Sequence, residues 1–160
     1  MPGKDVSKLI EQIEIGYEAL GVALKGITEA ELRRSPGGEE WSSAQVLGHV
    51  IEMGPFWAAK VKAIAQEGGD IPAKRTPPEV EQRLAAVANY GKASLADIRK
   101  GLAQSKTQCA KEISAVKDAE LDVKRKRGDE ETTLRKFIES HITGHVQEHA
   151  QQMAAARKAK

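Results

Sequence analysis

Apolar residues recur every three or four positions along four long segments of this 160-residue chain, and this spacing constrains its fold more than any other feature. Such spacing places the apolar side chains on one face of an α-helix, which must be buried against another element. The segments are 6–24, 42–67, 79–109 and 133–153. No segment alternates with the period of two that indicates a half-buried strand. The sequence therefore predicts an all-α protein, a four-helix bundle.

The length fits one domain over residues 1–160, and the composition excludes several classes of protein. Lys and Arg number 25 against 23 Asp and Glu, whereas a nucleic-acid surface would need a clustered basic footprint. Acidic residues inside the first helical segment are incompatible with a membrane span or a secretory signal. A single cysteine, Cys109, fits a reducing compartment, so we expect a cytoplasmic protein with Cys109 as a small buried residue.

Local signals suggest where the helices begin and end. Thr28 and Glu31 have the spacing of a capping box for a short helix before the second long segment. Pro55 predicts a kink or a break near Met53-Gly54. The third segment is predicted as one helix that runs at least to Cys109. Residues 110–128, between the third and fourth segments, are the least regular stretch and are predicted to include a solvated basic loop.

The four histidines are the strongest candidates for chemistry. His141, His145 and His149 are spaced four apart in the last segment, and His49 lies in the second. Residues four apart share one helix face, so either His141/His145 or His145/His149 could chelate one metal ion. Spacing alone does not choose between the pairs, because each step rotates by about 40° around the helix. With His49, three nitrogen ligands would leave a position open, which is typical of a catalytic site.

Two motifs in the chain resemble those of the DinB/YfiT-like superfamily. Residues 41–50 match the pattern W-S-x-x-x-h-h-x-H-h, in which h is apolar, at the start of the second long helix. Residues 145–153 match H-x-x-x-H-x-x-Q-h in the fourth. The order of the elements agrees as well, so the resemblance spans nearly the whole chain.

This resemblance implies an up-down-down-up four-helix bundle in which His49, His145 and His149 hold a divalent metal ion. Zinc or nickel is expected first, with iron or manganese as alternatives, and His141 takes a peripheral position near the metal or the substrate. The superfamily includes maleylpyruvate isomerases. It also includes S-transferases that use low-molecular-weight thiols. We therefore expect a transferase or hydrolase in which the metal activates a bound thiol or water for attack on a small molecule.

Two carboxylates are candidates for a catalytic role beside the metal. Glu52 lies one turn beyond His49, and Glu148 adjoins His149, so each could orient an imidazole or carry a proton. Both could also be ordinary surface carboxylates. We expect a homodimer. The alternative function is a non-enzymatic, dimeric stress or ligand-binding bundle with a weak or vestigial metal site.

Overall fold

A computed structural model describes residues 1–35 and 37–158 of the chain. In chain order the elements are α1 (Lys4–Ala23), α2 (Glu29–Arg33), α3 (Ser43–Glu67), α4 (Pro77–Gly91), α5 (Leu95–Ser114), α6 (Asp118–Leu121), β1 (Arg125–Arg127), β2 (Glu130–Thr132), α7 (Leu134–Phe137), the π-helix η1 (Ile138–Thr143) and α8 (Gly144–Lys158). The buried apolar faces of the long helices form one core. None of the described helices has the length and hydropathy needed to cross a membrane.

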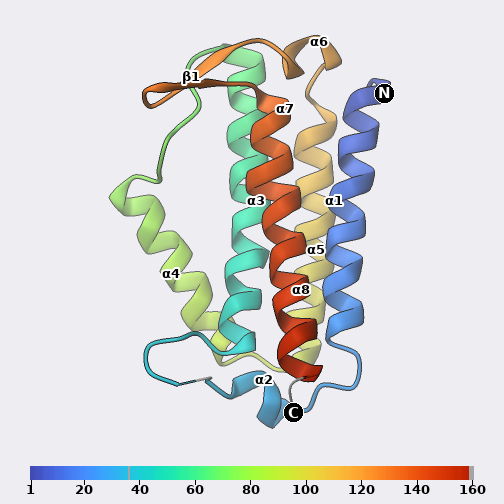
Figure 1. Cartoon of the computed structure of the whole chain (residues 1–160), viewed down its shortest axis with the longest axis vertical. Helices are drawn as coiled ribbons and strands as arrows, with labels where there is room; N and C mark the ends of the chain where they lie inside the picture. Colours follow the sequence, from blue (N-terminus) through green and yellow to red (C-terminus); the bar gives the residue numbers. More distant parts are fainter. Residues whose placement is uncertain (36, 159–160) are drawn as a thin grey trace.

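Figure 1 shows four long helical columns side by side, namely α1, α3, α5 and the continuous run from α7 through η1 to α8. The first and last columns run in one direction, and α3 and α5 run in the other. This arrangement is the up-down-down-up four-helix bundle that the resemblance implies. It places α3 and the last column against each other, so His49 can meet the histidines of α8.

The prediction of a single third helix is wrong, because this part of the chain forms two helices, α4 and α5. The break falls at residues 92–94, where the Ser94 side chain accepts a hydrogen bond from the Asp97 N–H and caps α5. α4 lies outside the bundle against α3 (Figure 1). It begins at Pro77, two residues before the predicted segment, and returns the chain so that α3 and α5 run parallel.

Gly48 lets α4 approach α3 closely beside the first histidine. A Cβ at Gly48 would lie 2.7 Å from the Cβ of Tyr90 and 2.9 Å from the carbonyl oxygen of Ala86. Any larger residue at Gly48 would therefore push α4 away from α3 at the position next to His49.

The basic stretch predicted as a solvated loop contains a short antiparallel hairpin, so the expectation that no strand forms is also wrong. Arg125 pairs with Thr132 and Arg127 with Glu130 across a turn at Gly128. The backbone of β1 accepts a hydrogen bond from the Ile71 N–H at 2.8 Å. Arg127 donates to carbonyl oxygens of the same loop, which connects α3 to α4. The hairpin therefore holds the α3–α4 loop in place through these hydrogen bonds, at one end of the bundle.

α3 continues through Pro55, so the predicted break near Met53-Gly54 does not occur. Proline lacks an N–H, which leaves the carbonyl of Ile51 without its helical donor. The Ser105 hydroxyl of α5 donates to this carbonyl at 2.8 Å and lies 2.8 Å from the buried hydroxyl of Tyr17 in α1. Ser105 thus supplies the donor that Pro55 lacks, and Tyr17 holds the Ser105 hydroxyl from the other side.

Replacing Gly54 with alanine is expected to lower the free energy of unfolding by about 1–3 kcal/mol, the usual range for overpacking. The reason is that a Cβ at Gly54 would overlap the Tyr17 hydroxyl. Urea denaturation measures the effect. In a Tyr17→Phe background the same substitution should cost clearly less, and an equal cost in both backgrounds would contradict this explanation.

Candidate metal centre

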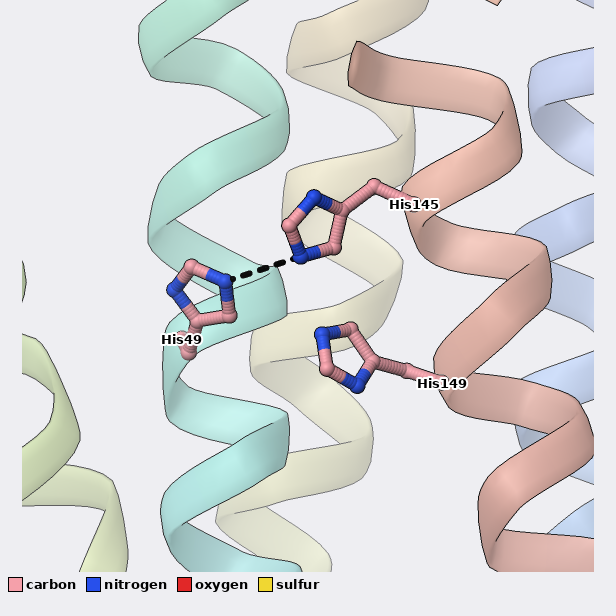
Figure 2. A group of neighbouring side chains, drawn as sticks. All are labelled: His49, His145 and His149. Carbon is pink, nitrogen blue, oxygen red and sulfur yellow. Dashed lines mark hydrogen bonds between the residues drawn. The ribbon is translucent and has the colours of Figure 1, made fainter. Parts of the chain in front are cut away.

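Three histidines from two helices converge in the bundle: His49 of α3 with His145 and His149 of α8 (Figure 2). The Nε2 atoms of His49 and His145 lie 3.2 Å apart. One ring nitrogen from each residue can be chosen so that all three lie within 4.8 Å of one another. Nitrogen ligands about 2.0–2.1 Å from a tetrahedral ion are roughly 3.3 Å apart, so no pair must approach by more than about 1.5 Å. The side chains need only small adjustments to share an ion.

The hydrogen bond of His149 prepares its other nitrogen to bind a metal. His149 Nδ1 lies 3.1 Å from Oε1 of Gln152, and an amide oxygen only accepts, so Nδ1 carries the proton and Nε2 keeps its lone pair. That Nε2 is buried and has no hydrogen-bond partner among the described residues. Figure 2 shows a ring nitrogen of His149 turned toward the other two rings. An unpaired buried acceptor costs about 1–3 kcal/mol, which a bound cation would offset, so the residues fit a metal ion.

Gln152 belongs to the motif that carries the resemblance, yet its role is visible only in the structure. Sequence reasoning could have found it from its spacing, because residues three apart on a helix are neighbours. A partner that fixes the tautomer of a ligating histidine is the usual companion of a metal site.

Burial keeps the three imidazoles neutral. It lowers the pKa of His49 to about 3, and His145, His149, Arg83 and Arg75 contribute to the same shift in that order. Burial is also the main cause that lowers the pKa values of His145 and His149. Since only neutral imidazole binds metal, the site holds its ligands in the competent form at neutral pH.

The metal-free protein is expected to lose stability on acidification because of His49. Between its ordinary pKa of 6.5 and its folded value of about 3, the unfolded chain binds a proton that folded His49 does not. The free energy of unfolding should therefore fall by up to about 1.4 kcal/mol per pH unit in this window, with no contribution from His49 above it. Urea denaturation in a chelator at several pH values measures the slope. His49→Ala should flatten it, and equal slopes would contradict the assignment.

His141 lies apart from the three converging histidines, because it belongs to the π-helix η1. Its ring stacks on Phe137 with centroids 4.5 Å apart and an interplanar angle of 11°, and its Nδ1 lies 2.8 Å from the Ser140 hydroxyl. A π-helical turn contains an additional residue, so it changes the angle between His141 and the residues that follow. Of the two pairs that spacing left open, the structure brings His145 and His149 to His49.

The Glu52 carboxylate pairs with an arginine, Arg75, rather than with a histidine. Its two carboxylate oxygens accept from the Arg75 guanidinium at 2.7 and 3.0 Å, and Gln82 donates to one of them at 3.0 Å. The side chains of Arg75 and Glu52 are only 4% and 8% exposed. Arg75 also lies 3.8 Å above the Phe56 ring. No hydrogen bond joins Glu52 to a histidine within the described part of the chain.

The remaining candidate residues from the sequence, all of them described, form no hydrogen bond with the three histidines. Glu148 is exposed beside His149. Cys109 is fully buried, as predicted, and burial raises the pKa of its thiol to about 12, so it is not poised as a nucleophile. The Trp41 ring, whose centroid is 5.6 Å from that of His49, lies next to the converging histidines.

Comparison with known proteins identifies the family and the fold. The family model of the DinB superfamily matches residues 12–153 of this chain. YfiT from Bacillus subtilis, described as a probable metal-dependent hydrolase with an unusual four-helix bundle topology, is similar in structure, with a TM-score of 0.70 and 16% sequence identity over 99% of this chain and 91% of that chain. At this identity the likeness shows a shared fold. No match is found among curated proteins.

Proposed function

This chain belongs to the DinB superfamily, and we propose that it is a divalent-metal-dependent enzyme, either a hydrolase or a thiol-dependent S-transferase. The observation that carries the proposal is the convergence of three histidine nitrogens, one of them buried with a free lone pair. The structurally similar YfiT is itself described as a probable metal-dependent hydrolase. We propose zinc or nickel as the ion, since imidazole suits both.

His49, His145 and His149 would hold the ion, and Gln152 would keep His149 in the ligating tautomer. A bound divalent ion stabilises the anion of a water or thiol and so lowers its pKa toward neutrality. Three protein ligands leave at least one coordination position for that nucleophile. The chain contributes three neutral imidazoles, of which that of His49 is buried and those of His145 and His149 are half-buried.

For the proton released by the nucleophile, we propose Glu148 as the acceptor. It is exposed beside His149 and is not held by a hydrogen bond among the described side chains. Glu52 is proposed to position Arg75 instead, because both of its oxygens are engaged.

Metal analysis of the purified protein tests the proposal most directly. After loading with zinc or nickel and removal of free metal, we expect about one equivalent per chain by elemental analysis. Loaded protein can then be assayed with ester and amide substrates and with low-molecular-weight thiols plus electrophiles. Protein that binds neither metal at micromolar concentration would overturn the enzyme proposal and favour the non-enzymatic bundle.

We also propose a homodimer, formed through α1 and α8. An apolar groove of about 620 Å³ lies between these helices and is lined mainly by alanine and glycine. Ile15 and Val22 protrude at its edge, 52% and 71% exposed. A two-fold interface pairs one patch with itself, so the protruding residues of one copy can enter the groove of the other. Sedimentation should give the mass of two chains, and a single-chain mass at all concentrations would overturn the dimer.

A further inference from the structure

Arg83 of α4 is a half-buried cation without an anionic partner. Its Nε atom is buried and makes no hydrogen bond, and no carboxylate pairs with it among the described residues. Arg75 is the opposite case, because Glu52 neutralises it with two hydrogen bonds. The buried Nε–H donor of Arg83 therefore lacks an acceptor, and an anionic ligand would supply both that acceptor and the missing counter-charge.

The packing of α4 on α3 places Arg83 level with the metal ligands. The neighbouring Gln82 donates to Glu52, and Ala86, one turn later on α4, contacts the backbone at Gly48. Arg83 lies between these two contact points, which on α3 are on either side of His49. The positive charge of Arg83 is also one of the smaller contributions that lower the pKa of His49, which agrees with this placement.

We propose that Arg83 makes this site selective for small molecules with an acidic group. This proposal rests on the proposed metal centre. One end of the ligand coordinates the metal, and its carboxylate or a similar anion binds Arg83. The planar guanidinium suits this task because its N–H donors match the two oxygens of a carboxylate. Metal ion and Arg83 are both positive, so an anion between them is stabilised by each.

Two thiols that differ only in charge provide the test, 3-mercaptopropionate and its neutral methyl ester. Each is titrated into cobalt-loaded protein, and the thiolate-to-cobalt charge-transfer band gives Kd. In Arg83→Gln the ratio of the ester Kd to the acid Kd should fall about tenfold, with cobalt stoichiometry unchanged. Arg83→Lys should lie between the two, because it keeps the charge and loses the planar fork. Arg34→Gln removes the same charge from an exposed position after α2 and should leave the ratio unchanged.

The outcomes separate this proposal from the metal centre itself. Wild-type protein that binds no cobalt would overturn both. Cobalt binding with the same ratio in wild type and Arg83→Gln, or without a charge-transfer band for either thiol, would overturn the role of Arg83 alone. If Arg83→Gln does not fold, the ratio in Arg83→Lys decides, and an unchanged ratio contradicts the proposal.

Discussion

Replacing His49, His145 or His149 with alanine is expected to weaken zinc binding by at least about a hundredfold. Loss of a companion residue already weakens metal sites by about 10–100-fold, and a lost ligand removes a metal bond outright. The two remaining imidazoles hold the ion with more open positions. Competition with a chromogenic chelator measures the affinity of each variant.

His141→Ala is the matched control, because it removes the same side chain from the same helical column. Its ring lies on Phe137, away from the three converging nitrogens, so zinc affinity should stay within a few-fold of wild type. Gln152→Ala should give an intermediate loss of about 10–100-fold, since the His149 tautomer is then no longer fixed. A loss in His141→Ala as large as that in His145→Ala would mean that the ligand set is different.

The second large effect is expected at the buried ion pair between Glu52 and Arg75. Arg75→Met leaves a carboxylate that is only 8% exposed without its cation, so the free energy of unfolding should fall by about 3–5 kcal/mol. Urea denaturation of the metal-free protein measures this loss.

Two comparisons identify burial as the cause. Adding Glu52→Gln to Arg75→Met should recover part of the stability, because no unpaired charge then remains inside. Lys124→Met breaks an ion pair whose members are 77% and 60% exposed, and it should cost less than about 1 kcal/mol. Equal losses for Arg75→Met and Lys124→Met would show that Glu52 is hydrated in solution.

Most helix boundaries followed from local signals. The capping box at Thr28 and Glu31 forms as predicted, and Ser42 begins α3 with a hydrogen bond from the Gln45 N–H. Such signals act over three or four residues, so they can be read without knowing what packs nearby. The break between α4 and α5 was missed because the apolar spacing continues across it. The local signals at this break, Gly91 at the end of α4 and the Ser94 cap of α5, are short and were outweighed by that spacing.

In the candidate site, too, some features follow from the local sequence and others from how the helices pack. The sequence by itself determined four amphipathic columns and put three histidines on one of them and one on another, because periodicity and residue identity are local properties. Tertiary structure decided which histidines meet, since the π-helical turn changes the angle of His141 while α3 brings His49 to α8. It also decided that Glu52 binds Arg75, a residue from the loop before α4. Distances between side chains on different helices depend on how whole elements pack, which no local spacing specifies.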